Sequence, residues 1–261
     1  METSRGQTAI IGELARFGRL DIATLSDRLG TSEETVRRHV KALADAGVVR
    51  MLRDGVALPT ALAEPPFRRR MELRADAKRL IGVHMAGLID DGATVLLDTG
   101  STTAYVGQAL AERHELTVVT NSVETARYLI GRNNHRVLIV GGETRAHDGA
   151  VLGAAAVDFV RRLRADWAIL SIGAFDLRGG LMDRDDDEAC FARTLIAQAD
   201  RVAVVADSTK FGRRSLVTIC PLKSVDILVT ETPPPALFES LLIEAEVEIS
   251  IADGSVGDGA G

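Results

Sequence analysis

Residues 94–103 read Thr-Val-Leu-Leu-Asp-Thr-Gly-Ser-Thr-Thr. The first four residues form a short aliphatic and β-branched run, which favours a buried strand. A polar loop follows and enters a helical stretch. Gly100 permits close approach of the backbone, and Ser101, Thr102 and Thr103 offer hydroxyls where N–H groups and the helix dipole favour an anion. The segment predicts a strand–loop–helix unit with an anion site, and an ordinary Ser/Thr helix cap is the alternative.

Runs of the same kind recur along the rest of the chain and alternate with helical stretches. We expect strands at 94–98, 116–119, 137–140, 168–172, 202–206, 226–229 and 247–251, and helices at 78–90, 103–112, 122–131, 153–163, 188–199 and 235–245. This alternation is typical of a mainly parallel sheet covered on both faces. The predicted fold class is therefore α/β, with a Rossmann-like body.

Polar residues follow several of these strands. In an open parallel sheet, ligands bind beyond the carboxyl ends of the strands. Carboxylates there suit sugar hydroxyls, and Lys210 suits a phosphate or a carbonyl oxygen. The pattern predicts a small, polar, phosphorylated ligand, although each loop taken alone could be a turn. The candidate effector-binding residues are Asp98, Gly100, Ser101, Thr102, Thr103, Asn121, Ser122, Gly142, Glu143, Asp207 and Lys210.

Other chemistries have little support. No GxGxxG follows the first strand, and the chain contains no GxxxxGK[ST], HExxH or GxSxG. Cys190 and Cys220 form no CxxC pair. The acidic run 183–188 is interpreted as a solvated helix cap, with a ligand-facing or metal-binding loop as the alternative. We expect no cofactor, no metal site and no catalytic residue.

The first 58 residues differ from the rest. Helices are predicted at 5–17, 22–29 and about 32–45, followed by a hairpin with Asp54-Gly55 at its tip. Thr31 and Glu34 have the spacing of a capping box, with Thr31 as the N-cap. Short helices joined at Gly30 and followed by a hairpin are typical of a winged helix–turn–helix.

The third of these helices has one apolar and one basic face. Val36 and Val40 lie within about 40° of each other, while Arg38 and Lys41 fall near the opposite side. Arginine suits bidentate contacts with guanine or phosphate, so this face predicts DNA binding, with a solvated surface as the alternative. We expect His39 to pack at a boundary. The candidate DNA-binding residues are Thr24, Ser32, Thr35, Arg37, Arg38, Lys41, Arg50 and Arg53.

Charge separates the same two regions. The chain has 261 residues and a net charge of −6. Residues 1–80 hold 15 Lys and Arg against 11 Asp and Glu, whereas residues 81–261 hold 16 against 26. A basic head on an acidic body suggests that only the head meets a polyanion.

The expected domains are a DNA-binding domain at 1–58, a linker at 59–76, a sensor at 77–253 and a flexible tail at 254–261. We expect no membrane span and no secretory signal, and two unpaired cysteines favour a reducing cytoplasm.

These motifs together resemble the DeoR family of bacterial transcription regulators over nearly the whole chain. The resemblance rests on 34–38 and 47–49 in the head, and on 98–103, 119–122, 141–145 and 206–212 in the body. It implies a sensor similar to ribose-5-phosphate isomerase, an effector that is a phosphorylated sugar or polyol, and a DNA-binding oligomer. The chain departs from the family at His39, where Asp is usual, and at Arg53-Asp54-Gly55, where His-Gly-Gly is usual.

The expected function is that of a transcriptional repressor. It would control a carbohydrate or polyol catabolic operon and leave its operator DNA when a phosphorylated metabolite binds, with glycerol 3-phosphate as one candidate. We expect a homodimer or homotetramer and no enzymatic activity. The alternatives are an activator, an effector-independent DNA-binding protein, and a sugar-phosphate isomerase-like enzyme with Glu143 as its base.

Overall fold

The computed structural model describes residues 5–17, 19–45, 48–52, 55–57 and 65–254. The chain divides into two compact units, Met1–Pro65 and Pro66–Gly261. We call them the head and the sensor, and each is described by itself.

The head is a winged helix–turn–helix, as predicted. Its helices are α1 (Arg5–Phe17), α2 (Ile22–Leu29) and α3 (Glu33–Asp45). Its strands are β1 (Arg19–Leu20), β2 (Arg50–Leu52) and β3 (Gly55–Ala57), which pair antiparallel in the order β1-β3-β2. Strand β1 was not anticipated, because two residues carry no recognisable pattern. The buried core of the head is Ile10, Ile11, Leu14, Leu25, Val36, Val40, Leu43, Val49 and Val56.

Side-chain caps define the turn between α2 and α3. Asp21 accepts a hydrogen bond from the Thr24 backbone at the start of α2, and Gly30 ends that helix with a φ of 59°. Ser32 Oγ accepts from the Thr35 backbone N–H at 3.3 Å, so Ser32 is the N-cap of α3. The prediction of Thr31 as the N-cap was wrong by one residue, because helix α3 begins at Glu33.

The sensor is built on a seven-stranded, all-parallel sheet in the order β13-β12-β10-β7-β4-β5-β6. All seven expected strands are present, with ends that differ by at most three residues. They are β4 (Thr94–Leu97), β5 (Thr117–Thr120), β6 (Arg136–Ile139), β7 (Ala165–Ser171), β10 (Ala199–Val205), β12 (Ile227–Thr230) and β13 (Glu248–Ile251).

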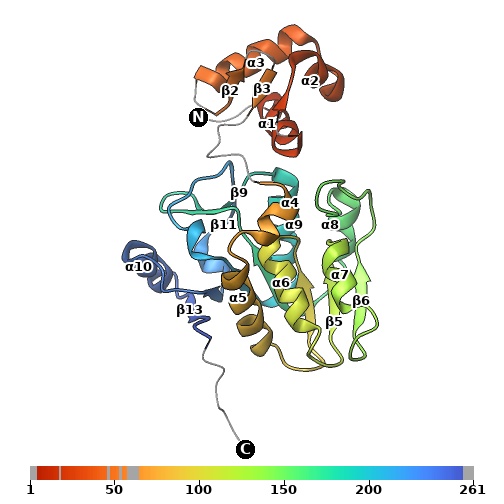
Figure 1. Ribbon diagram of the computed structural model, residues 1–261, viewed down its shortest axis with the longest axis vertical. Coiled ribbons are helices and arrows are strands. Elements are labelled where there is room, and N and C mark those ends of the chain that lie inside the picture. The colour runs from red at the N-terminus through yellow and green to blue at the C-terminus, as the bar shows by residue number, and fades with distance from the viewer. Residues whose placement is uncertain (1–4, 18, 46–47, 53–54, 58–64, 255–261) are drawn as a thin grey trace, which may run out of the picture. The chain divides into compact units, whose positions relative to one another are not determined.

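Helices cover both faces of this sheet (Figure 1). Alternate side chains of a strand point to opposite faces. Val95 and Leu97 of β4 therefore pack beneath one helix layer, and Leu96 packs beneath the other. The first layer is α5 (Ala75–Gly87), α6 (Ser101–Leu110) and α7 (Val123–Leu129), and the second is α8 (Ala154–Val160), α9 (Asp186–Ile196) and α10 (Ala236–Glu244).

A small antiparallel sheet adjoins the second layer and was not predicted. Its strands are β8 (Ala174–Asp176), β9 (Gly180–Asp183) and β11 (Val217–Cys220), in the order β11-β9-β8. Phe175 of β8 packs on Phe211 and Phe238, with ring centroids 5.6 and 4.9 Å away. The aromatic contacts connect this sheet to α10 and to the loop after β10.

Part of the range expected to be a linker is helical. Helix α4 (Phe67–Glu72) follows Pro66, and α5 already begins at Ala75. Phe67 is buried, and the Tyr105 hydroxyl of α6 donates to the Met71 carbonyl at 3.0 Å. These tertiary contacts hold a six-residue helix that the sequence pattern alone does not predict. No described helix is long and apolar enough to cross a membrane.

Candidate DNA-binding face and candidate effector site

The exposed face of α3 carries the cations expected there. Val36, Val40 and Leu43 are buried, whereas Arg38 and Lys41 are exposed on the other side. Arg37 is also exposed and pairs with Glu33 one turn earlier at 2.9 Å. Arg50 of the wing strand β2 is exposed as well. These are cations of the kind that contacts phosphates and base edges.

The hydroxyl residues predicted at this site have structural partners. Thr24 Oγ1 donates to the Asp21 carboxylate at 3.0 Å, and Ser32 and Thr35 are hydrogen-bonded to each other. Their capping role is therefore evident. His39 is half-buried and its ring lies against Gly6 of α1, where an added Cβ would be 2.9 Å from Nε2. Arg53 lies outside the described residues.

The sensor strands bring their carboxyl ends to one edge of the sheet. The chain leaves β4 for β5 and β6 on one side and later adds β7 on the other side, so the sheet order reverses between β4 and β7. Ser171 at the end of β7 donates to the Thr99 carbonyl at 3.2 Å. Gly100 has a φ of 155°, and an added Cβ there would lie 2.0 Å from Ser171 Oγ. Glycine is required for this close approach.

The loop after β4 is buried and contains both bonded and unbonded hydroxyls. Thr103 Oγ1 donates to the Gly100 carbonyl, and Thr102 is 2% exposed. Ser101 Oγ accepts from Lys78 Nζ at 2.9 Å. Thr99 Oγ1 makes no hydrogen bond among the described residues. The start of α6 thus combines free backbone N–H groups, a hydroxyl without a partner and a nearby ammonium.

The two residues after β5, Asn121 and Ser122, differ in their hydrogen bonding: Ser122 caps a helix, and Asn121 does not. Ser122 Oγ accepts from the Thr125 backbone and caps α7. Asn121 is fully buried, and its amide lies beside the Asp98 carboxyl, but neither its side-chain oxygen nor its nitrogen makes a hydrogen bond of ordinary geometry within the described part of the chain. A buried amide without partners costs free energy unless something else satisfies it.

The loop after β6 contains two candidate effector-binding residues, Gly142 and Glu143, and it leaves Glu143 exposed. Gly142 has a φ of 149°, and a Cβ there would meet Val151 at 2.8 Å. Glu143 is exposed, and no hydrogen bond or ion pair involves its carboxylate within the described residues. The structure therefore does not bring Glu143 together with the buried strand-end side chains.

Further polar residues follow β10 and β12. Asp207 is buried and accepts from the backbone and the hydroxyl of Thr209. Burial lowers the pKa of Lys210 to about 8, although Asp207 opposes the shift. Glu231, which the sequence analysis missed, accepts from Ser208 and pairs with Arg74 at 2.5 Å.

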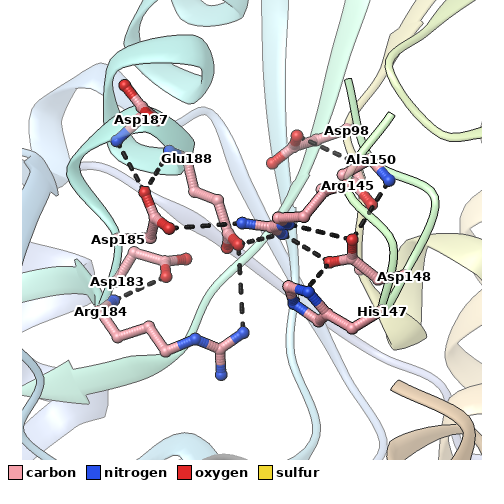
Figure 2. A network of polar contacts seen from close by, with 12 residues as sticks. Asp98, Arg145, His147, Asp148, Ala150, Asp183, Arg184, Asp185, Asp187 and Glu188 are labelled. Carbon is pink, nitrogen blue, oxygen red and sulfur yellow. Dashed lines mark hydrogen bonds and ion pairs between the residues drawn. The ribbon is translucent and has the colours of Figure 1, made fainter. Parts of the chain in front are cut away.

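A network around Arg145 lies beside these strand ends (Figure 2). Arg145 is buried and donates to Asp148 at 2.5 Å, to Asp185 at 3.3 Å and to Glu188. Burial lowers the pKa of Arg145, but Glu188 and Asp148 raise it more. Burial likewise raises the pKa of Glu188, but Arg145 and Arg184 bring it down to about 2.

Asp98 belongs to the same neighbourhood (Figure 2). Burial and the negative charge of Glu188 raise the pKa of Asp98 to about 8. Burial and Glu188 also raise the pKa of Asp183. A neutral Asp98 can both donate to and accept from a hydroxyl.

The acidic run 183–188 is thus only partly the solvated cap that was favoured. Asp185 caps α9, and the side chain of Asp186 is 63% exposed. Glu188 instead turns inward and pairs with Arg145. The described residues contain no group of three or more His, Cys, Asp or Glu side chains that could hold a metal ion.

Several residues of this region were not singled out from the sequence. Arg145 was quoted only as part of a motif, and Lys78 was not considered. No local pattern distinguishes a buried lysine in the first turns of a helix from an exposed one. Asp185 and Glu188 belong to an acidic run that indicates a helix start, but their pairing with Arg145, 40 and 43 positions away, is visible only in the fold.

Both units match known families. Residues 73–232 match the DeoR C-terminal sensor domain, and residues 7–50 match a winged helix-turn-helix DNA-binding domain. The chain belongs to the DeoR family. It is 29% identical over 251 residues to the glycerol-3-phosphate regulon repressor of Escherichia coli, covering 96% of this chain and 100% of that protein. It is 31% identical over 236 residues to the HTH-type transcriptional repressor CsqR of the same organism, covering 90% of each.

As a DeoR-family member, the chain is a DNA-binding transcriptional repressor with a sensor domain for a small-molecule effector. The named relatives reported above are regulators of transcription.

Two solved structures share part of the fold. Ribose 5-phosphate isomerase from Plasmodium falciparum has 13% identity and a TM-score of 0.37, covering 51% of this chain and 52% of that one. The structure of eIF2B beta from Chaetomium thermophilum has 16% identity and a TM-score of 0.46, covering 66% of this chain and 54% of that one. The chain thus spans about half the length of each.

Proposed function

We propose that this DeoR-family repressor controls a carbohydrate or polyol catabolic operon and is released from its operator by a phosphorylated metabolite. The observation that carries the proposal is the chemistry of the strand-end site. Lys78 and Lys210 supply positive charge near the start of α6, and the fully buried Asn121 makes no hydrogen bond of ordinary geometry among the described residues. This set suits a phosphate next to a hydroxyl-bearing carbon chain.

The residues divide into two roles in this proposal. The N–H groups of α6 from Ser101 to Thr103, together with Lys210, hold the phosphate. Asp98, Asn121 and Asp207 bind hydroxyl groups, and Gly100 leaves space for the ligand to approach the backbone. Glycerol 3-phosphate is the first compound to test, because relatives in Escherichia coli and Haemophilus influenzae are named glycerol-3-phosphate regulon repressors.

On the DNA side, α3 enters the major groove and the wing contacts the backbone. Arg38 and Lys41 have no ion pair in the described residues and can reach base edges or phosphates. Binding of the effector favours an arrangement of the head that fits the operator poorly, so operator affinity falls. The proposed oligomer is a homodimer or homotetramer, since winged and helix–turn–helix regulators read paired half-sites.

A thermal-shift panel tests the effector half of the proposal. The purified chain is heated with glycerol 3-phosphate, fructose 1-phosphate, fructose 6-phosphate or ribose 5-phosphate. A ligand at 100 times its Kd adds about 2.7 kcal/mol to the free energy of unfolding, so one compound should raise the Tm selectively. Lys210→Ala should lose most of that rise, and Lys223→Ala, which changes an exposed lysine, should keep it. No rise with any phosphorylated compound would contradict the proposal.

A further inference from the structure

Lys78 is a buried ammonium group with only neutral oxygens around its nitrogen. It is 4% exposed, and Nζ donates to the Arg70 carbonyl at 2.5 Å and to Ser101 Oγ at 2.9 Å. No carboxylate lies within 4 Å of this nitrogen among the described residues, although the more distant Asp207 partly offsets the effect of burial on the pKa of Lys78. A buried charge without a counter-charge is costly. Burial accordingly lowers the pKa of Lys78 to about 8.

The two acceptors of Lys78 belong to different parts of the sensor. Ser101 is the first residue of α6, where the proposed effector phosphate binds. Arg70 belongs to α4, the first helix of the sensor and the element that follows the wing strand β3 in chain order. Residues 58–66 are all that separate β3 from α4. Lys78 therefore connects the proposed anion site to the segment through which the chain continues into the head.

Helix α4 is short and is held by contacts with the rest of the sensor. It has six residues and no side-chain N-cap, and the Arg70 guanidinium lies near the carboxylates of Glu188, Asp148 and Asp183. Its described attachments to the rest of the sensor include the buried ring of Phe67, the Tyr105 hydroxyl on the Met71 carbonyl, and the Lys78 ammonium on the Arg70 carbonyl. A helix this short is not stable alone, so losing a charge-assisted hydrogen bond in its last turn loosens it.

We propose that Lys78 transmits effector binding to helix α4 by transferring its hydrogen bond from the Arg70 carbonyl to the anionic group of the effector. This inference rests on the proposed function, since it needs an anion at the start of α6. A phosphate beside Ser101 supplies a counter-charge in direct contact with Lys78, and its full negative charge attracts the ammonium more strongly than the dipole of a neutral carbonyl does. The carbonyl end of α4 then loses its donor, and this helix is loosened.

Thr99 and Asn121 independently indicate that a ligand completes this site. Thr99 Oγ1, one residue before Gly100, is more than nine-tenths buried and has no hydrogen-bond partner in the described residues; the equally buried Asn121 amide lies beside Asp98 but makes no hydrogen bond of ordinary geometry there. A polar ligand at the start of α6 satisfies both of these groups.

Hydrogen exchange of the α4 amides in the full-length protein tests the proposal. The probe is whichever of the four panel phosphates raises the Tm most, with inorganic phosphate as the anion without a carbon chain. In the wild type, the compound should raise exchange of the 67–73 amides about tenfold, the effect of losing one hydrogen bond to a charged group. Lys223→Met, an exposed lysine, should respond like the wild type.

Two variants of Lys78 separate its roles. Lys78→Met removes the donor, so α4 should exchange fast without any compound and show no further change on adding one. Lys78→Gln keeps a neutral donor for the Arg70 carbonyl but offers no charge to the anion. Its α4 should exchange nearly as slowly as in the wild type, and the compound should change it little, even if the methionine variant folds poorly.

The outcomes distinguish this inference from the proposed function. A compound that raises the Tm but leaves α4 exchange unchanged in the wild type overturns the role of Lys78 and leaves the effector proposal intact. A Lys78→Gln protein whose α4 exchange rises with the compound as in the wild type also overturns the role of Lys78 and leaves the effector proposal intact. If no phosphorylated compound raises the Tm, the effector proposal fails and the inference fails with it.

Discussion

Arg145 and Lys78 are both buried cations, but their surroundings differ. Arg145 is held by Asp148, Asp185 and Glu188, so its charge is more than balanced within the protein. Lys78 meets only a hydroxyl and a backbone carbonyl. The first arrangement fixes the loop after β6 against α9. The second leaves an unbalanced positive charge where a ligand can bind.

Asp98 should make the stability of the sensor depend on pH. Burial and Glu188 raise its pKa to about 8 in the folded protein, against 3.8 for an ordinary aspartate. Between these values the folded state holds a proton that the unfolded state has lost. The free energy of unfolding therefore falls as pH rises, by up to about 1.4 kcal/mol per pH unit. Asp98→Asn cannot ionise and should show a shallower slope, and the slope that remains is expected from Asp183, whose pKa is also raised.

Urea unfolding at pH 5, 6, 7 and 8 measures this effect through the fluorescence of Trp167, the single tryptophan, which is buried in β7. Asp158→Asn, at an exposed position of α8, serves as the control and should keep the wild-type slope. An unchanged slope in Asp98→Asn would show that another group titrates in this range.

Arg38 should affect DNA binding alone. It is exposed on α3, opposite the buried Val36 and Val40, so Arg38→Ala removes a DNA contact without disturbing the core. We expect affinity for a site selected from a random DNA pool to fall about tenfold. Effector-induced Tm shifts should stay as in the wild type. Arg132→Ala, at an exposed position of the sensor, should bind DNA normally. Loss of the head fold in Arg38→Ala would instead indicate a structural role.

At the scale of elements, the N-cap of α3 contributes measurably to the stability of that helix. Ser32 satisfies a backbone N–H at the start of the helix, whereas Thr31 takes part through its backbone, which bonds with Ser26. Ser32→Ala should destabilise α3 by about 1 kcal/mol and raise the exchange of its amides about fivefold. Thr31→Ala should have a much smaller effect. Equal effects of the two substitutions would contradict the assignment of Ser32 as the cap.

The main sheet could be predicted because each strand carries its own signal. Runs such as 94–97 and 202–205 are buried on both faces, so they consist almost wholly of aliphatic residues. The small sheet gives no comparable signal, since β8 (Ala-Phe-Asp) and β9 (Gly-Leu-Met-Asp) contain no β-branched residue and each ends in an aspartate. Helix α4 is mostly charged and is defined by Phe67 and Tyr105, which are 38 positions apart.

The candidate effector site was predictable to a similar extent. Positions after strands could be expected to lie at one edge of the sheet because parallel strands share one polarity, and the structure buries Asp98, Asn121 and Asp207 at the ends of their strands. What the sequence could not show is which charges are buried together. Arg145 and Glu188 look like surface residues until the fold places them in contact.

For the whole molecule, the proposed mechanism requires reciprocity. If the effector weakens operator binding by some factor, operator DNA must weaken effector binding by the same factor. Couplings of this kind are typically 5- to 150-fold, or about 1–3 kcal/mol. Titration of the selected DNA with and without the compound gives one factor, and calorimetry of the compound with and without DNA gives the other. Two equilibrium factors that differ beyond error would rule out simple linkage.

The strand order of the sensor also bears on how the protein is made. Strands β5 and β6 add in turn to one side of β4, and β7, β10, β12 and β13 then add in turn to the other. Each new strand therefore pairs with one that has already left the ribosome, and none has to insert between two earlier strands. The sheet can grow outward from β4 during translation, so nascent chains need not wait for the last residues before they begin to bury their apolar surface.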